Sequence, residues 1–449
     1  MSILNVAPRL FGLHRPDAYP TIRQAWPGDA SAHNDSPRLA NQSGVAPGGS
    51  KMRIPFNRPL VAKGAFAYLE QAIANRHLSG DGPFTKKCQQ LLEDLLGVPR
   101  VLLTTSCTDA LELAALLLNI QPGDEVIVPS FTFVSTANAF VLRGARPVFC
   151  DVRPDTFNMD ENSLEQLISE RTRAIVPVHY AGVGCEMDPI MTIANRHDIA
   201  VVEDNAHGLM GRYRGRHLGT FGALATLSFH ETKNFTCGEG GAIVINDNAW
   251  MDRAEVLREK GTNRSRYFRG QIDKYTWVDL GSSFLPADVL ATLLLAQLES
   301  REEIQARRRA LWHRYADGLA AWAKEEGVQI PFVPLHCEQA YHMFYLVMPT
   351  LDARQALIAH LRALGINSVF HYLPLHLSPM GRAFGGREGD CPVTEAVSER
   401  LVRLPFYFDL TDSELTSVVE VIQTFRHARS SGYGPGDDTC QTRRTPRAA

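Results

Sequence analysis

Short apolar runs alternate with helical patterns through the first half of the chain, between about residues 100 and 245. Helical periodicity is clear in segments such as TDALELAALLLN and PIMTIANRH. The predicted strands between and after such segments are RVLLT, EVIVPS, PVFCDV, AIVPVHY, IAVVEDN, ALATLSF and GAIVIND. Short strands that alternate with helices form a mainly parallel sheet with helices on both faces. This part of the chain therefore predicts an α/β domain with a mainly parallel central sheet.

The pattern changes after about residue 290. One long helical pattern starts at Pro286 (PADVLATLLLAQLESREEIQARRRALWHRYADGLAAW), and the last helical pattern is DSELTSVVEVIQTFRH. We therefore expect a large domain over 52–290 and a smaller C-terminal α+β domain over 291–429. The segment 1–51 is rich in Pro, Gly, Ser and Asn, which predicts disorder, and 430–449 is predicted to be a disordered tail. A transit peptide, or a working start at Met52, stays an alternative for the first segment.

The composition is that of an ordinary globular protein, with 45% hydrophobic and 21% charged residues. A net charge of −3 gives no general attraction to nucleic acid or to an anionic membrane. The eight cysteines form no C-x-x-C pair, which argues against a zinc ribbon or a disulfide scaffold. The apolar runs are too short to span a bilayer, and no secretory leader is seen. We expect a cytoplasmic protein without a bound metal.

Four hydroxyl side chains gather where the first predicted helix of the sheet domain begins. Thr104, Thr105, Ser106 and Thr108 stand in LLTTSCTDAL, directly after a predicted strand. A helix start offers free backbone N–H groups and positive partial charge, so hydroxyls placed there can bind a phosphate. Ser and Thr are also common helix caps. A phosphate site and an ordinary N-cap are therefore both open at this position.

A carboxylate follows two valines at the end of another predicted strand. Asp204 stands in VVEDNAH, and an ionised carboxylate in such a place needs a cationic partner. The protonated nitrogen of a pyridine ring is one candidate partner, as in cofactors that act as electron sinks. A helix cap and an internal salt bridge are the alternatives for Asp204.

A single lysine stands between two predicted strands in SFHETKNFTCGEGG. Lys233 follows Ser228 and His230, and the glycines after it give backbone freedom where something must approach closely. Taken alone, Lys233 is an ordinary surface cation. A phosphate site, a buried acid and a lysine are together what pyridoxal 5′-phosphate (PLP) requires, namely a phosphate anchor, a partner for the ring nitrogen and an amine. The three features jointly favour a PLP site.

Several segments occur in an order typical of one enzyme family. They are GDGPFTKKCQQ, LLTTSCT, GDEVIVPSFTFVSTANAFVLRGA, DVRPDTFNMDE, VPVHYAG, VVEDNAHG, SFHETKN, REKGTNRS and QIDKYTW. From Arg53 to about His427 the chain resembles the DegT/DnrJ/EryC1/StrS sugar aminotransferases. The resemblance implies a PLP-dependent fold of type I, like that of aspartate aminotransferase, and a homodimer with composite active sites.

The resemblance also assigns residues to the cofactor. Lys233 matches the lysine that holds PLP, and Asp204 matches the acid on the pyridine nitrogen. The other implied cofactor contacts are His207 near the ring hydroxyl, Thr108, Asp109 (through its backbone) and Ser228 at the phosphate, Phe133 stacked on the ring, and Ser283. Two positions depart from the common pattern, since Cys107 and Ser283 stand where many members have Gly and a partner-subunit Asn. Without the resemblance, Phe133 is expected in the core.

Substrate contacts are implied for five residues. Arg264 and Arg269 lie in REKGTNRSRYFRG and could hold a diphosphate from across the dimer, or form a solvated basic loop. His230, His342 and His376 lie in segments that the family uses near the sugar. For each of these histidines, a surface or core position is the alternative.

The branch that the chain most resembles implies a specific reaction. Glutamate would give its nitrogen to PLP, with Lys233 as the proton carrier, and the nitrogen would pass to the C4 ketone of dTDP-4-keto-6-deoxyglucose. The implied product is dTDP-4-amino-4,6-dideoxygalactose, for surface polysaccharide in a pathway like that of enterobacterial common antigen. Another 4-keto nucleotide sugar and a non-enzymatic nucleotide-sugar sensor are the alternatives. A dehydratase branch with histidine in place of the lysine is disfavoured, as is a nicotinamide enzyme, because no G-x-G-x-x-G follows the first strand.

Overall fold

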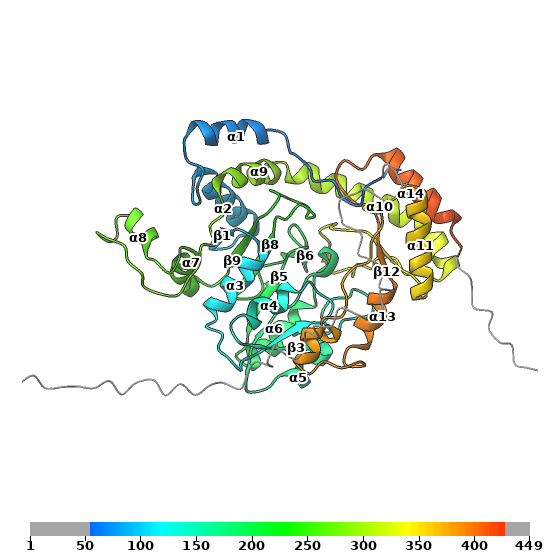
Figure 1. Ribbon diagram of the computed structural model, residues 1–449, viewed down its shortest axis with the longest axis horizontal. Helices are drawn as coiled ribbons and strands as arrows, with labels where there is room; N and C mark the ends of the chain where they lie inside the picture. The colour runs from blue at the N-terminus through cyan, green and yellow to red at the C-terminus, as the bar shows by residue number, and fades with distance from the viewer. Residues whose placement is uncertain (1–53, 427–449) are drawn as a thin grey trace, which may run out of the picture.

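The computed structural model describes residues 54–426 of the 449-residue chain (Figure 1). The segments 1–51 and 430–449, which were expected to be disordered, lie outside the described residues. A body built around the largest sheet fills the centre of the view. A smaller group of elements, including α11 (Leu351–Ala363) and α14 (Asp412–Thr424), lies to its right.

The central sheet has seven strands, in the order β1-β9-β8-β5-β4-β2-β3. Each of the seven apolar runs that predict strands supplies one of them. The strands are β1 (Arg100–Thr104), β2 (Glu125–Pro129), β3 (Arg146–Cys150), β4 (Thr172–Ile175), β5 (Ala200–Asp204), β8 (Leu224–Ser228) and β9 (Gly241–Ile245). Only β9 runs antiparallel to its neighbours, and all the other pairings in this sheet are parallel. The predicted α/β architecture with a mainly parallel sheet is confirmed.

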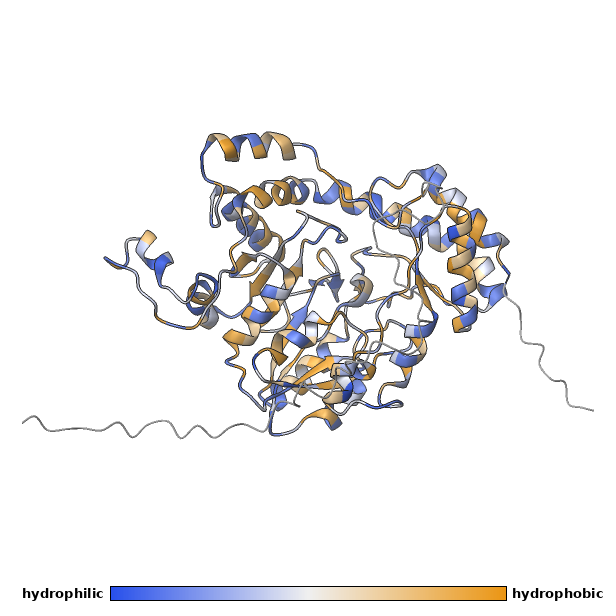
Figure 2. Cartoon of the chain, in the orientation of Figure 1, coloured by the Kyte–Doolittle hydropathy of each residue, from blue (hydrophilic) through white to orange (hydrophobic). Residues whose placement is uncertain are grey.

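Helices cover both faces of this sheet because successive strand residues point to opposite sides. On one face, Leu102 and alternate residues of the other strands pack with α3 (Cys107–Leu117), α4 (Ser135–Val141) and α7 (Met251–Arg258). On the other face, Val101 and Leu103 pack with α2 (Pro83–Leu96) and α9 (Asp288–Glu299), and α6 (Met187–Arg196) covers the remaining strands. Figure 2 shows hydrophobic colours on these strands and on α9.

The long helical pattern that starts at Pro286 forms two helices, not the single one that the sequence predicts. It divides at Ser300, whose φ and ψ of −89° and 10° end α9 and precede α10 (Arg301–Glu326). A serine can hold such a break because its side chain competes with the helix for backbone hydrogen bonds. The division lets α9 pack on α1 (Ala65–Ala74) and α2, while α10 packs on α14.

The second body has its own core. Residues of α10, α11 and α14 surround it together with Ile54 near the start of the described chain. Two short strands, β11 (Tyr345–Val347) and β12 (Leu401–Arg403), pair antiparallel beside them. The expected boundary at residue 290 lies inside α9, and the division into domains at that position stays a prediction.

The remaining elements are short. They are α5 (Leu164–Leu167), β6 (Arg212–Tyr213), β7 (Arg216–His217), α8 (Arg264–Phe268), β10 (Cys337–Glu338), α12 (Pro379–Ala383), α13 (Pro392–Arg400) and the 3₁₀ turns Glu161–Ser163, Tyr180–Gly182, Asn248–Trp250 and Leu375–Leu377. Strands β6, β7 and β10 form a small separate sheet. Among residues 54–426, no helix has both the length and the apolar character to cross a bilayer.

Candidate active site

Two strands of the central sheet end, and a third begins, in one row of paired residues. Thr104 at the end of β1 pairs with Gly241 at the start of β9, and Gly241 pairs with Ser228 at the end of β8. Asp204 ends β5, the next strand along. The predicted chemical groups therefore collect at one edge of the sheet, where parallel strands present their carboxyl ends and where ligands of open α/β sheets bind.

The start of α3 lies at this edge, and it divides its hydroxyl groups between two tasks. Ser106 is the N-cap, since its Oγ accepts a hydrogen bond from the backbone N–H of Asp109 at 3.0 Å. Thr105 donates to the carboxylate of Asp109, while Thr108 Oγ1 lies 2.8 Å from Ser135 Oγ. The N-cap interpretation thus holds for Ser106, and Thr108 stays at the helix start with a neighbouring hydroxyl from α4.

Glycine is required where β9 passes this helix start. A Cβ on Gly241 would collide with the backbone of Ser106 and with the backbone nitrogen of Cys107. With hydrogen in that place, the strand comes up against the first turn of α3. The helix start and the strand that leads away from the lysine loop are therefore packed backbone to backbone.

Asp204 is buried, and its carboxylate is held by neutral donors. Thr136 on α4 donates to Oδ2 at 2.7 Å, and the backbone N–H of Ala206 donates to Oδ1 at 3.2 Å. No Lys, Arg or His of the described chain forms an ion pair with it, so the internal salt bridge considered from the sequence is not found there. A buried carboxylate without a cation is what the partner of a protonated ring nitrogen requires.

Lys233 lies in a loop between β8 and β9 that is closed by a backbone hydrogen bond from the N–H of Phe229 to the carbonyl oxygen of Gly240 at 2.8 Å. The loop is anchored because Phe229, Phe235 and Cys237 are buried in the core beneath it. The side chain of Lys233 is half-buried. Loss of hydration lowers its pKa to about 8, although the nearby Cys107 and Asp204 act in the opposite direction. The structure thus brings Asp204 within electrostatic reach of an amine that is easier to deprotonate than an ordinary lysine.

His207 follows Asp204 by three positions and is also buried. Its ring stacks on that of His342, and its Nε2 lies 3.4 Å from the Tyr372 hydroxyl. Nδ1 of His207 is buried without a hydrogen-bond partner among the described residues. Burial lowers the pKa of His207 and of His342 well below the usual range, so both rings are neutral.

Phe133 is 57% exposed, so the expectation of a core position, made without the family resemblance, is wrong. Its neighbour Phe131 occupies the core instead. The ring of Phe133 lies 6.5 Å from that of Tyr372. An exposed aromatic face at this edge is free to stack on a flat heterocycle.

These groups fit PLP on the chemistry that each offers. Within residues 54–426, the buried carboxylate of Asp204 forms no ion pair, and the buried Nδ1 of His207 has no hydrogen-bond partner. The half-buried amine of Lys233 has a lowered pKa. The start of α3 and Ser228 offer hydrogen-bond donors for a phosphate. Asp204 would hold the ring nitrogen, His207 the ring hydroxyl and Lys233 the aldehyde carbon. The phosphate would be held by Thr108 and Ser228.

Ser283, Arg264 and Arg269 come from a different part of the chain, although the carbonyl oxygen of Phe284, next to Ser283, accepts a hydrogen bond from the Thr105 N–H at 3.0 Å. They belong to, or follow, an arm that includes α8, which projects from the left of the body in Figure 1. Ser283 is exposed and pairs through its backbone with Glu259. Arg264 is 3.3 Å from Glu259 and Arg269 is 2.8 Å from Glu255, so acids of the same chain hold both guanidinium groups.

The histidines expected near the sugar have three different environments. His342 lies beside His207, whereas His230 is exposed and bonds to Thr232. His376 is fully buried, with its two ring nitrogens bonded to Ser130 at 2.6 Å and Glu395 at 2.9 Å. That environment favours a structural role for His376, and no free ring nitrogen is left for a sugar.

Several residues at the site were missed by the sequence analysis. Thr136 holds Asp204, Tyr372 reaches His207, and Arg403 on β12 acts electrostatically on Lys233. Thr136 lies in the segment SFTFVST, three positions after Phe133, but its partner could be identified only in three dimensions. Tyr372 and Arg403 come from the second body, and the residue pattern around them singles out neither one.

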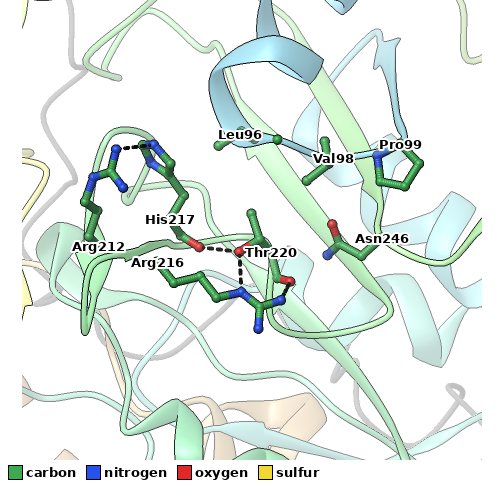
Figure 3. Close-up of a pocket in the computed structure, with 9 residues that line it drawn as sticks. Leu96, Val98, Pro99, Arg212, Arg216, His217, Thr220 and Asn246 are labelled. Atoms are coloured by element: carbon green, nitrogen blue, oxygen red, sulfur yellow. Dashed lines mark hydrogen bonds between the residues drawn. The ribbon is translucent and has the colours of Figure 1, made fainter.

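A second pocket lies at the opposite edge of the central sheet (Figure 3). Leu96 to Pro99 precede β1 and Asn246 follows β9, so the pocket is at the other end of both strands from Thr104 and Gly241. Its volume is about 330 Å³. Arg212 and Arg216 line it, but their guanidinium groups already bond to residues of their own hairpin and to Thr220. Among the described residues, no cluster of His, Cys, Asp and Glu could hold a metal ion.

Comparisons with known proteins give a consistent result. The model of the DegT/DnrJ/EryC1/StrS aminotransferase family matches residues 60–423. The spore coat polysaccharide biosynthesis protein SpsC of Bacillus subtilis is 32% identical over 378 residues, covering 82% of this chain and 96% of SpsC. An uncharacterised protein of Methanocaldococcus jannaschii is 35% identical over 350 residues, covering 76% of this chain and 90% of that protein.

A solved structure agrees closely with the fold. Spr1654 of Streptococcus pneumoniae, described as a sugar aminotransferase, matches with a TM-score of 0.77 and 28% identity, covering 83% of this chain and 98% of that one. It has been solved in a PLP form and a PMP form.

Proposed function

The chain belongs to the DegT/DnrJ/EryC1/StrS aminotransferase family and is a PLP-dependent sugar aminotransferase, and from that premise we propose its substrate and product. The enzyme transfers an amino group from L-glutamate to the C4 ketone of dTDP-4-keto-6-deoxyglucose, a nucleotide-linked 4-keto-6-deoxyhexose. The product is dTDP-4-amino-4,6-dideoxygalactose, used for surface polysaccharide in a pathway like that of enterobacterial common antigen. The name of the relative SpsC supports a role in polysaccharide synthesis.

The observation that carries the chemistry is the combination of a buried Asp204, which forms no ion pair among the described residues, with the lowered pKa of the nearby Lys233. PLP, when bound, supplies an electron sink that lets a proton leave the carbon next to the transferred nitrogen. Asp204 keeps a proton on the ring nitrogen, because its carboxylate is buried and needs a positive partner. Thr136 fixes the orientation of that carboxylate through its 2.7 Å hydrogen bond.

Lys233 has two tasks in this proposal. Its pKa of about 8 leaves roughly a tenth of the amine neutral at pH 7, compared with far less for an ordinary lysine. In its neutral form Lys233 would hold the cofactor covalently at its aldehyde carbon, with loss of water. When it is not bonded to the cofactor, its Nζ would accept a proton from the donor carbon and return it to the carbon that needs one.

A homodimer with composite active sites is part of the proposal. The arm that includes α8 exposes large apolar side chains, among them Phe268 at 69% and Trp277 at 76%. Several large exposed apolar side chains on one segment favour a protein interface there. A partner's arm would bring Ser283 to the cofactor phosphate, and Arg264 and Arg269 to the nucleotide diphosphate, by exchange of their present acidic partners.

A cytoplasmic location completes the proposal. All seven cysteines of the described chain are free thiols, as expected in a reducing compartment. Another 4-keto nucleotide sugar would use the same cofactor groups, so the sugar is decided by product analysis. A non-enzymatic sensor would not need an amine with a lowered pKa.

The test is an incubation of the purified protein with dTDP-4-keto-6-deoxyglucose and glutamate, followed by mass spectrometry and NMR of the sugar. We expect an amino group at C4 with the galactose configuration. The Lys233→Ala variant is the matched control and should yield no amino sugar. A glucose configuration at C4, or an unchanged sugar from the wild-type protein, would contradict the proposed product.

A further inference from the structure

The pocket in Figure 3 is separate from the candidate active site and takes no part in the proposed reaction. Its lining comes from the turn before β1, from Thr220 ahead of β8 and from Asn246 after β9. The other ends of these three strands form the row of paired residues at the active-site edge. Pro99 precedes Thr104 by the length of β1, which spans roughly 16 Å of extended chain. A small ligand in this pocket would therefore lie out of contact with the cofactor.

The hairpin of β6 and β7 carries three arginines that have different partners. Arg214, at the turn, pairs with Asp188 at 3.0 Å. Arg212 and Arg216 line the pocket, and neither forms an ion pair with an acid of the described chain. Glu338 stands opposite Arg212 in the pairing of β10 with β6, yet it is not within ion-pair distance. Two guanidinium charges at the pocket are therefore left without an acidic partner from the part of the chain that the structure describes.

Neutral groups hold both guanidinium groups in place. Arg212 donates to the carbonyl oxygen of Gly215 at 2.7 Å and to Nε2 of His217 at 2.6 Å. Burial, followed by the charge of Arg212, lowers the pKa of His217, so this imidazole is neutral. Arg216 donates to Oγ1 of Thr220 at 3.0 Å and to the carbonyl oxygen of the same residue. Because a guanidinium has five N–H donors, each arginine keeps donors for a ligand after these bonds are made.

The rest of the pocket indicates the size and character of the ligand. Leu96, Val98 and Pro99 supply apolar side chains to the lining. The guanidinium of Arg216 lies over the ring of Phe221, 4.4 Å from its centre, which fixes its orientation further. The volume of about 330 Å³ is in the range of sites for small organic molecules. The pocket therefore offers fixed cations on one side and apolar surface for an organic group on the other.

Two fixed cations match a dianion better than a monoanion. A phosphate monoester carries a charge of about −1.5 to −2 at pH 7 on three acceptor oxygens, whereas a carboxylate carries one charge on two oxygens. Phosphate oxygens also accept parallel hydrogen bonds from the planar fork of an arginine. We propose that the pocket binds an organic phosphate monoester, held by Arg212 and Arg216. Its organic group lies against Leu96, Val98 and Pro99.

The experiment is a titration of the PLP-loaded enzyme with phenyl phosphate, followed by phosphorus NMR. The dianionic phosphate and the apolar ring of this probe represent the two halves of the ligand. We expect saturable binding, with a Kd that rises at least about tenfold in Arg216→Gln and in Arg212→Gln, because each variant loses a charge-assisted contact. The phosphorus signal of PLP should not shift, since the probe binds at the other end of the strands.

Arg214→Gln is the matched control. It removes a positive charge from the same hairpin, but Arg214 is bonded to Asp188 and does not line the pocket. The Kd of phenyl phosphate should change less than about twofold in this variant. Inorganic phosphate is the second probe, and it should bind more weakly than phenyl phosphate because it has no apolar group to bury.

Four results would overturn the inference: no binding of phenyl phosphate at millimolar concentration, an unchanged Kd in both pocket variants, an equal loss in Arg214→Gln, or inorganic phosphate that binds as tightly as phenyl phosphate. A shifted PLP signal with an unchanged Kd in the pocket variants would assign the probe to the active site. Arg216→Lys keeps the charge but not the fork, and its intermediate Kd provides the comparison if the glutamine variants fail to fold. Binding that depends on Arg212 and Arg216 in a protein that aminates no nucleotide sugar would leave this inference standing and refute the proposed substrate.

Discussion

The imidazole rings of His207 and His342 stack with their centroids 4.2 Å apart and their planes at 17°. Nδ1 of His342 donates to Asn234 Oδ1 at 2.9 Å, because the amide nitrogen of Asn234 is already bonded to the carbonyl of Ala340. Asn234 directly follows Lys233. The stack therefore links the lysine loop to the imidazole that we assign to the cofactor.

Removal of His342 should loosen the cofactor without preventing its binding. An aromatic pair contributes about 0.5–1.5 kcal/mol, so His342→Ala should weaken the affinity of the apoenzyme for PLP by about 3- to 10-fold. A titration of the apoenzyme with PLP, followed by absorbance, measures this. His313→Ala removes an exposed histidine on α10 and is the control. Equal affinities of His342→Ala and the wild type would contradict a supporting role for the stack.

The pH dependence of cofactor incorporation should follow Lys233. Only the neutral amine reacts with an aldehyde, and loss of hydration lowers the pKa of Lys233 to about 8. The rate at which the apoenzyme incorporates PLP should therefore rise with pH and reach half of its maximum near pH 8. Stopped-flow absorbance between pH 6 and about 10 measures the rate. A midpoint near that of a solvated lysine would show that burial does not act on this amine.

Thr136 should act on turnover through Asp204. A hydrogen bond to a charged group is worth about 1.5–3 kcal/mol, so Thr136→Val should lower the single-turnover rate by about tenfold or more. Asp204→Asn should lose still more of the rate while retaining some bound cofactor. Thr132→Val is the matched control, because Thr132 bonds to Thr136 at 2.9 Å and not to Asp204. A Thr136→Val enzyme with the wild-type rate would refute the orienting role.

Gly241→Ala should harm both folding and phosphate binding. The added methyl would meet the backbone of Ser106 and Cys107, which cannot rotate away, so we expect a loss of about 1–3 kcal/mol of stability and a weaker affinity for PLP. Thermal unfolding of the apoenzyme and a PLP titration measure the two effects. In Gly240→Ala the added Cβ would lie 2.6 Å from the sulfur of Cys237, the end of a side chain that can move, so this variant should lose less.

The exposed arm should control assembly. If Trp277 packs against a second copy of the chain, Trp277→Asp buries a charge in that interface and should shift the protein from dimer to monomer. Light scattering after size-exclusion chromatography measures the mass. Leu335→Asp changes a fully exposed apolar residue far from the arm in sequence and should leave the dimer intact. A Trp277→Asp protein that remains dimeric would exclude the arm as the main interface.

Much of the large body could be predicted because its signals are local. Each apolar run of the first half forms one strand of the same sheet. Asp204 ends β5 and Lys233 follows β8, and these two strands are parallel neighbours in the sheet. The rule that the carboxyl ends of parallel strands share an edge was therefore enough to bring the two residues together. The sequence could not decide between a phosphate site and an N-cap for the hydroxyl cluster of 104–108, because only Ser106 among these residues caps the helix.

The second body could not be predicted at the same level. Tyr372 and Arg403 reach the site only because that body packs against the sheet edge, and this contact depends on residues far apart in the sequence. The break at Ser300 was also missed, because the helical periodicity of apolar residues continues through it. Phe133 was expected in the core because its apolar aromatic side chain follows a predicted strand. An exposed aromatic that stacks on a ligand has the same residue type as a buried one, so the sequence does not distinguish them.

The backbone pairing of Thr104 with Gly241, and of Gly241 with Ser228, fixes the separation of these three residues. Their spacing is set by backbone pairing across three strands, whereas the loop that leaves Ser228 and returns at Gly241 is held in the core by Phe229, Phe235 and Cys237. A change in the exposed residues of that loop, such as Glu231 and Glu239, would therefore leave both the strand pairing and the anchor of the amine in place.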